Sequence, residues 1–300
     1  MKRIASSLID GRGFDVVLVG VPIAFLLLLS GLPLIYNIIM SFQQVDMFSL
    51  GTFSRPFVGF QNYINLMEQP ETWPIFRNTA LFVIASITGQ FLLGFGLALF
   101  FGVNFPGASW LRGLFLVSWV MPGLVVGATW NWILSGDFGV FNYVLRESGL
   151  INANIFWRSD PDFSLWAVII ANIWLGTSFN MILLSVGLSG ISKDLYEAAE
   201  LDGANVVQRF LTITLPMMRS SIGALISLGL IFTLQQFDLF AAITSGGPAN
   251  SSNVAQYWAW DLSFRQYDFA KGATVSVIMI VFVVFASVVY VRSTRHEVRG

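Results

Sequence analysis

The chain has 300 residues, of which 55% are hydrophobic and only 11% are charged, and its net charge at pH 7 is −1. A soluble domain carries about 25% charged residues, so this composition excludes an ordinary soluble protein and favours one that crosses a membrane several times. The small net charge argues against a nucleic-acid partner, and the absence of cysteine excludes disulfides, thiolate metal sites and cysteine nucleophiles.

Six apolar stretches are long enough to cross a bilayer as helices, which takes about 20 residues each. They are roughly 16–42, 78–103, 112–134, 164–189, 216–243 and 271–291. The apolar runs are continuous rather than alternating, which favours helices over the strands of a barrel. We therefore predict an all-α membrane protein with a short N-terminal segment, residues 1–15, and a single transmembrane domain over residues 16–300.

The distribution of basic residues predicts the orientation of the spans, because cytoplasmic loops carry more Lys and Arg. Of the 16 basic residues, six lie in the three longer loops 43–77, 135–163 and 244–270 or at their edges, and ten lie on the other side. Those ten are Lys2, Arg3, Arg12, Arg112, Lys193, Arg209, Arg219, Arg292, Arg295 and Arg299. Both termini are therefore expected in the cytoplasm, and the three longer loops outside.

Prolines and small residues indicate where helices bend or approach one another. Gly94, Ala98 and Gly102 recur every four residues in the second span, a spacing that lets helix backbones come close. A proline inside a span leaves one carbonyl without its helical partner, whereas a proline at an early helical position costs little. The first span holds Pro22 and Pro33, the third holds Pro122, and Pro216 is expected to open the fifth.

The stretch between the fourth and fifth spans, EAAELDGANVVQRFLTITLP at 197–216, is unusual because it interrupts apolar sequence with a small-residue, acidic segment. Ser192 is a plausible N-cap for a short helix over residues 193–202, and Gly203 lies where a left-handed residue would end it. Residues 205–212 are expected to form a second short turn. The result is a helical elbow outside the bilayer, whose simplest interpretation is a solvated connector.

The same residues resemble the loop signature of the membrane subunits of bacterial ATP-binding-cassette importers. That signature is Glu-Ala-Ala, three residues, Gly, nine residues and Ile-x-Leu-Pro, and the spacing here matches it in full. VGFQNY at 58–63, TWNWILSGDFGVFNYVL at 129–145 and FDLFAAITSGGP at 237–248 are similar to segments of the maltose-transporter-like permeases. The resemblance implies a type I importer permease fold of six transmembrane helices with a cytoplasmic coupling helix.

The resemblance also implies the partners. A second permease subunit, two ATPase subunits and an extracytoplasmic solute-binding protein would complete the importer in a bacterial inner membrane, with a carbohydrate as the solute. The chain lacks the pattern GxxxxGK followed by Ser or Thr, so it is expected to hold no cofactor and to be no enzyme, with ATP and Mg on the ATPase. The expected ATPase-coupling residues are Glu197, Ala198, Ala199, Asp202, Gly203, Ile213, Leu215 and Pro216.

Polar side chains within spans are candidates for a substrate path, because they are costly in lipid. Asp238 is the one acid well inside an apolar run; it either faces the pore or makes a structural bond, and its match to a Phe-Asp pair of the family favours the structural bond. The other candidates are Gln90, Asn131, Asn172, Gln235 and Gln236, with Trp130 as a ring that could stack on a sugar or belong to an interfacial aromatic belt.

The turn Gly246-Gly247-Pro248 lies in the third outer loop, which the resemblance assigns to contact with the solute-binding protein. A plain hairpin between spans would explain the same composition. Three other functions remain as alternatives: the same importer with a non-sugar solute, a secondary transporter, and a membrane enzyme. One intramembrane acid and no visible repeat argue against a secondary transporter, and no reactive constellation supports an enzyme.

Overall fold

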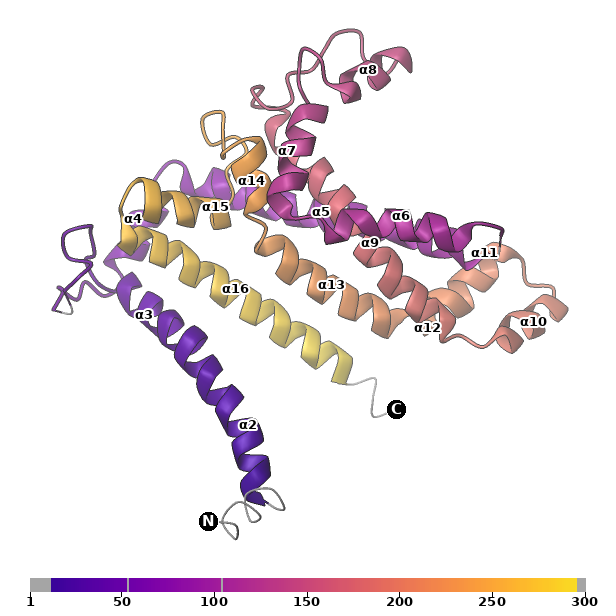
Figure 1. Ribbon diagram of the computed structural model, residues 1–300, viewed down its shortest axis with the longest axis horizontal. Coiled ribbons are helices and arrows are strands. Elements are labelled where there is room, and N and C mark those ends of the chain that lie inside the picture. The colour runs from indigo at the N-terminus through magenta and orange to yellow at the C-terminus, as the bar shows by residue number, and fades with distance from the viewer. Residues whose placement is uncertain (1–11, 53, 104, 296–300) are drawn as a thin grey trace, which may run out of the picture. The chain divides into compact units, whose positions relative to one another are not determined.

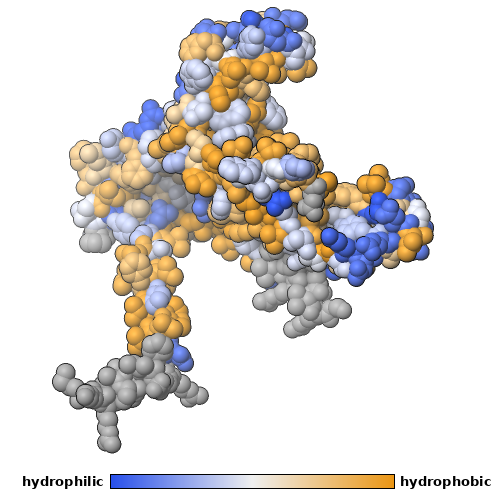
Figure 2. Space-filling view, turned by 45° about the vertical axis from the view of Figure 1, so that its right-hand side comes forward, coloured by the Kyte–Doolittle hydropathy of each residue, from blue (hydrophilic) through white to orange (hydrophobic). Residues whose placement is uncertain are grey.

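The computed structural model describes residues 12–52, 54–103 and 105–295 (Figure 1). The basic residues Lys2, Arg3 and Arg299 lie outside this part of the chain. Four of its helical stretches are long and apolar enough to cross a membrane, and the count rises to six if each of two bent helix pairs forms one span. Many large apolar side chains of these helices are exposed on the chain by itself, and much of the surface in view is hydrophobic (Figure 2).

The described residues group into two compact units. The first unit combines residues up to Glu68 with Ala259–Val277. Its helices are α2 (Arg12–Leu26), α3 (Leu32–Ser41) and α4 (Gln61–Met67), followed by a π-helical turn at Asp261–Arg265 and the start of α16 (Phe269–Arg295). The second unit combines Gln69–Trp258 with the rest of the chain.

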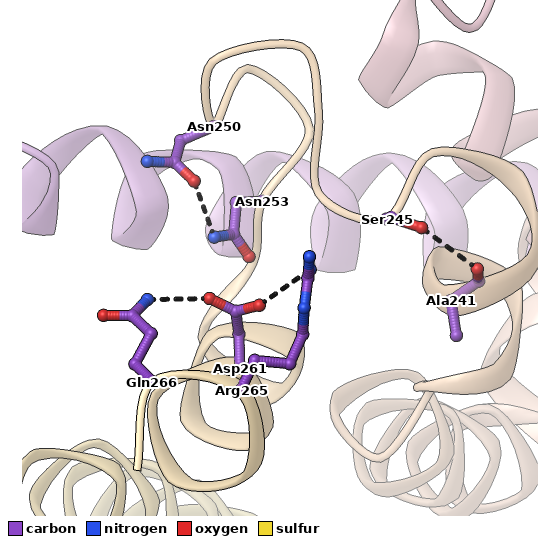
Figure 3. A network of polar contacts seen from close by, with 7 residues as sticks. All are labelled: Ala241, Ser245, Asn250, Asn253, Asp261, Arg265 and Gln266. Atoms are coloured by element: carbon purple, nitrogen blue, oxygen red, sulfur yellow. Dashed lines mark hydrogen bonds and ion pairs between the residues drawn. The ribbon is translucent and has the colours of Figure 1, made fainter. Parts of the chain in front are cut away.

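The first unit is held together by polar bonds around the 58–63 segment. The Asn62 Nδ2 donates to the carbonyl oxygens of Ser41 and Gln43, each at 2.9 Å, and the Tyr63 hydroxyl lies 2.7 Å from the Ser41 Oγ. Asp261 is bonded to Arg265 and Gln266 within its own turn (Figure 3). In the loop after α3, hydrogen bonds from Ser49 lower the pKa of the exposed Asp46 carboxyl.

Proline is accommodated inside the first span by a wider helical turn. A five-residue π-helical turn, Leu27–Gly31, joins α2 to α3, and the Leu32 amide donates to the Leu27 carbonyl one residue further back than in an α-helix. Pro33 follows directly, in the first turn of α3. The helix therefore continues from Arg12 to Ser41, in agreement with a single span at about 16–42.

The second unit is built on α5 (Thr72–Gly102) and α9 (Ser164–Ser189), which correspond to the predicted second and fourth spans. The residue numbers of contacting positions increase along both helices, since Gly89 lies against Ile173 and Gly94 lies against Asn180. The helices therefore run parallel, as two even-numbered spans must.

Two of the predicted spans are not continuous helices. The third consists of α6 (Ala108–Val120) and α7 (Gly123–Ile133), which are bent by 101° at Met121-Pro122. The prediction of a single span at 112–134 is wrong in this respect, because Pro122 fixes an extended backbone that ends one helix and caps the next.

The predicted fifth span, 216–243, also needs correction. A helical arm runs over Val206–Met217, bends by 65° at Met218, and is followed by α13 (Arg219–Leu234). Residues 235–237 then break the helix, and α14 (Asp238–Ile243) is a separate short helix. The long loops 135–163 and 244–270 carry α8 (Val140–Glu147) and α15 (Ala255–Trp260).

The small residues Gly94, Ala98 and Gly102 of α5 differ in how closely another helix approaches them. A Cβ placed at Gly94 would lie 2.5 Å from the Asn180 Cβ and 3.0 Å from the Met181 backbone nitrogen, whereas one at Gly102 would meet nothing within 4 Å. Ala98 is buried, at 1% exposure. The predicted close approach of backbones is thus confirmed at Gly94, where α9 crosses, and not at Gly102.

Gly94→Leu is therefore expected to destabilise the packing of α5 against α9. Overpacking of this kind costs about 1–3 kcal/mol, and it should lower the thermal unfolding midpoint of the purified protein. Gly96→Leu is the matched control, because it lies in the same helix and a Cβ there meets nothing within 4 Å. Equal unfolding midpoints for the two variants would contradict this account of the crossing.

Candidate functional site

The elbow after α9 forms as the sequence predicts. The helix α10 spans Lys193–Leu201, the Ser192 hydroxyl accepts a hydrogen bond from the Asp194 amide, and Asp202 is the C-cap. Gly203 has a φ of +80°, the left-handed conformation that was expected to end the helix. The Gly203 and Ala204 amides donate to Glu200 and Ala199, so the turn satisfies two carbonyls that a helix end leaves open.

The second arm of the elbow is one helical stretch made of α11 (Val206–Arg209), a π-helical turn (Phe210–Thr214) and α12 (Leu215–Met217). Asn205 and Gln208 exchange hydrogen bonds as a capping box at its start. Pro216 lies inside this arm and does not open α13. The prediction is wrong here because the π-helical turn comes just before the proline, as it does before Pro33, and lets the helix continue.

The elbow presents an acidic side chain that the rest of the described chain does not neutralise. Glu200 is paired with Arg209, at 2.8 Å between Oε2 and Nη1. Glu197 is exposed, and among the described residues it has no hydrogen-bond or ion-pair partner. Ala198 beside it is exposed and Ala199 half-buried. The surface around Glu197 thus carries small side chains, is accessible and is negatively charged.

Sequence reasoning missed an apolar component of the same surface. Leu201 is 90% exposed, Val206 is 72% exposed and Val207 is 65% exposed, on both sides of the Gly203 turn. Hydrophilic side chains gather at this projecting end of the second unit, with hydrophobic ones among them (Figure 2). The sequence feature that indicates this surface is the apolar pair Val206-Val207 close to the turn at Gly203. Large apolar side chains left exposed on a projecting element indicate a contact surface.

The remaining signature residues have different surroundings. Ile213 packs against a buried cluster that contains Phe95, Leu184 and Met218, while Leu215 and Pro216 are exposed on the arm. Asp202 is exposed at the C-cap of α10. The signature therefore combines residues that face outward with one that anchors the arm to the membrane helices.

Several candidate substrate-path residues gather where the helices are broken. Gln235 is the exposed C-cap of α13, Gln236 is half-buried, and Asp238 begins α14. Asp238 is not inside a continuous span as predicted, because residues 235–237 leave the helix before it. A Cβ at Gly123 would lie 2.5 Å from an oxygen of the Asp238 carboxylate, so that carboxylate lies against the N-terminus of α7, where a negative charge is favoured.

The amide candidates are mostly used within the fold. The Asn131 Nδ2 donates to the Ala242 carbonyl at 2.8 Å and so joins α7 to α14. The Gln90 Nε2 donates to the Asn172 carbonyl at 2.9 Å, inside the α5–α9 contact. Asn172 is 4% exposed, and its Nδ2 has no hydrogen-bond partner among the residues that the structure describes. The structure thus brings Gln235, Gln236 and Asp238 together and places Gln90 and Asn172 in a helix interface.

Trp130 lines a cavity of about 750 Å³ with walls from α5, α6, α7 and α9. Its ring lies edge to face with that of Trp174, with 6.0 Å between centroids. The hydroxyls of the cavity are already bonded, since Thr177 donates to Ile173 and the Ser118 and Ser178 hydroxyls pair with each other at 2.7 Å. The cavity therefore offers ring and aliphatic surface rather than free hydrogen-bonding groups.

The Gly246-Gly247-Pro248 loop is firmly attached to the helices of the second unit. The Asn78 Nδ2, on α5, lies within 3.3 Å of the carbonyl oxygens of Asn250, Ser251 and Asn253. Ser251 is also bonded to Ser164 at the start of α9. Within the loop, Asn253 donates to Asn250, and the Ser245 hydroxyl donates to the Ala241 carbonyl (Figure 3). These bonds fix the loop to α5 and α9.

Apolar helices, two broken helix pairs and a projecting elbow define a helical multi-pass membrane protein. Residues 90–296 match the family model described as "Binding-protein-dependent transport system inner membrane component". The chain belongs to this family.

Two curated relatives match most of the chain. It is 31% identical over 241 residues to the "Trehalose/maltose transport system permease protein MalF" of Thermococcus litoralis, which covers 80% of this chain and 81% of that protein. It is also 31% identical over 239 residues to the "Sulfoquinovosyl glycerol transport system permease protein SmoG" of Agrobacterium fabrum, with 80% and 77% covered.

Solved structures confirm the type I importer permease fold. A chain of a bacterial ABC transporter involved in the import of the acidic polysaccharide alginate superposes with a TM-score of 0.77 and 22% identity, over 97% of this chain and 99% of that one. A second alginate transporter structure, in complex with an alginate pentasaccharide-bound periplasmic protein, gives a TM-score of 0.79 and 18% identity over 98% of both chains.

Proposed function

We propose that this chain is the permease subunit of an ATP-driven, binding-protein-dependent importer and forms half of a translocation pathway for a carbohydrate. The observation that carries the proposal is the helical elbow with Glu197 exposed at its surface and without a partner among the described residues. Both named relatives carry solutes that contain a sugar, which supports the carbohydrate class. The excess of Lys and Arg on one side supports an orientation with both termini and the elbow in the bacterial cytoplasm.

The elbow is suited to bind a separate ATPase subunit. Glu197 offers a carboxylate to a basic side chain of the partner, and Leu201, Val206 and Val207 offer apolar area around it. An interface with an apolar centre and charged pairs at its edge has the composition of a specific protein contact. ATP and Mg belong to that partner, and nucleotide-driven closure of two ATPases would move the elbow.

The broken helices are suited to hold the solute. Discontinuous helices in transporters bring unwound backbone and polar side chains to one place, and Gln235, Gln236 and Asp238 lie at such a break. The rings of Trp130 and Trp174 supply the flat apolar surface on which a sugar face stacks. The outer loop held by Asn78 provides a fixed surface for the solute-binding protein.

The test is reconstitution of the complete importer, with the second permease, the ATPase and the binding protein, in proteoliposomes. A ligand screen on the binding protein is expected to select a carbohydrate, and that solute should stimulate ATP hydrolysis and be taken up only with ATP. Gln236→Ala should lower uptake about tenfold without changing the amount of assembled complex, since one lost bond to the solute is enough for such a factor.

Two outcomes would count against the proposal. Uptake that follows a proton or sodium gradient without ATP would show a secondary transporter instead. A binding protein that selects a non-sugar solute would keep the importer and reject the carbohydrate.

A further inference from the structure

We propose that Tyr196 is a positioning residue that fixes α10 to the second arm of the elbow, so that a displacement of α10 is passed on to the membrane helices. This inference rests on the proposed function, because it says how a pull on the elbow reaches the transmembrane part. It concerns the connections inside this chain and not the surface that a partner touches.

The starting point is how few groups tie α10 to the rest of the chain. None of its residues is fully buried. Its two ends lead into turns, at Gly190 to Ser192 and at Gly203, and turns bend easily. Side-chain bonds therefore decide whether α10 moves together with its neighbours or by itself.

Two side chains of α10 make polar bonds to the second arm. Glu200 pairs with Arg209, but its side chain is 70% exposed, and exposed ion pairs contribute little. The Tyr196 hydroxyl lies 2.8 Å from the hydroxyl of Thr214, which is only 4% exposed. The bond to Thr214 is the one shielded from water, so it is the stronger mechanical link.

The ring of Tyr196 extends the same link into the membrane helices. It packs against a buried cluster formed by Phe95 and Ala98 of α5, Leu184 of α9, Ile191, Met218, and Leu225 of α13. Phe210, the first residue of the π-helical turn in the second arm, has its ring centroid 5.6 Å from that of Phe95. One aromatic side chain therefore connects α10 to the arm and, through the cluster, to α5, α9 and α13.

The location of Thr214 fits this role. It is the last residue of the π-helical turn, immediately before Leu215-Pro216. The backbone hydrogen bonds of a π-helical turn hold it less firmly than those of an α-helix. The bond from Tyr196 to Thr214 therefore stiffens the part of the arm that bends most easily. Without the Tyr196 bond, the arm could bend at the π-helical turn while α10 moves.

The experiment removes the hydroxyls one at a time in the reconstituted importer. Tyr196→Phe and Thr214→Val are each expected to lower the solute transported per ATP hydrolysed about fivefold, the factor that corresponds to one lost neutral hydrogen bond. The double variant should lower the ratio no further than either single variant does. Thr214→Ser, which keeps the hydroxyl, should retain the original ratio, and the amount of ATPase bound to each variant should stay unchanged. Thr212→Val is the control, because its hydroxyl bonds only to the Gln208 carbonyl of its own helix.

A second measurement needs no ATPase. The chain has no cysteine, so a single cysteine at Leu201, which is 90% exposed, takes one spin label. In the isolated permease Tyr196→Phe should increase the mobility of that label, and Thr212→Val should not. Unchanged mobility and an unchanged transport ratio in Tyr196→Phe would overturn the inference.

The two proposals fail in different ways. If Glu197→Lys leaves the ATPase bound, the proposed docking surface is wrong, and the spin-label result still decides whether Tyr196 fixes α10. If Glu197→Lys releases the ATPase while Tyr196→Phe changes neither the ratio nor the label, the docking stands and only the positioning role is rejected.

Discussion

Gly203→Val is expected to reduce solute uptake by the reconstituted importer at least about tenfold while the protein still accumulates in the membrane. The Gly203 φ of +80° is costly for any residue with a Cβ, by about 1–2 kcal/mol, and worst for a β-branched one. A Cβ here would meet no atom within 4 Å, so the loss arises from the backbone alone and reorients α10 relative to the second arm.

Two control variants separate the backbone effect from other causes. Gly203→Asn should keep most of the uptake, because asparagine tolerates the left-handed conformation better than other side chains. Gly190→Ala, at the other end of the elbow, should change solute uptake very little, since Gly190 has an ordinary helical backbone with φ −78°. Full uptake by Gly203→Val would show that the direction of α10 is not set by this turn.

Glu197→Lys is expected to weaken the binding of the ATPase subunit to the permease at least tenfold, which corresponds to about 1.4 kcal/mol. The carboxylate is exposed and unpartnered within the described chain, so its reversal costs the fold nothing and acts only on a partner. Glu197→Gln should show a smaller effect, since it removes attraction without adding repulsion.

The measurement is the amount of ATPase that remains with the purified permease as salt or dilution increases. Glu147→Lys on α8 is the matched charge reversal. Glu147 is exposed in the loop 135–163, which is predicted to face away from the cytoplasm, so the variant should leave ATPase binding unchanged. If the two reversals behave alike, the elbow is not the docking surface.

Local chemistry made the elbow the most predictable part of the molecule. Ser192, Asp194 and Gly203 act through bonds and dihedral angles set by their immediate neighbours, and each is found as expected. Continuous apolar sequence also predicted both ends of α9 and the C-terminal end of α5, although α5 begins at Thr72 rather than at residue 78. In both cases the information lies within one helix.

Pro122 indicated a bend in the third span, but the size of that bend and the break at residues 235–237 were not predictable in the same way. Hydropathy measures how apolar a stretch is and not whether its helix continues, so Pro122 and residues 235–237 were counted inside spans. Pro216 was misjudged because a π-helical turn, which leaves no mark in composition, lets the arm pass through it. The partners of Asn78 and Asn131 lie more than 100 residues away in sequence, and no local pattern contains them.

The contact between α7 and α14 has one further consequence. Gly127 leaves no room for a Cβ beside Ala242, Asn131 is bonded to the Ala242 carbonyl, and Gly123 lies against Asp238. The two short helices α7 and α14 are thus packed closely against each other, although 115 positions separate Gly123 from Asp238 along the chain. Any movement of one of these short helices would therefore carry the other with it, because the two share a close backbone contact and a hydrogen bond.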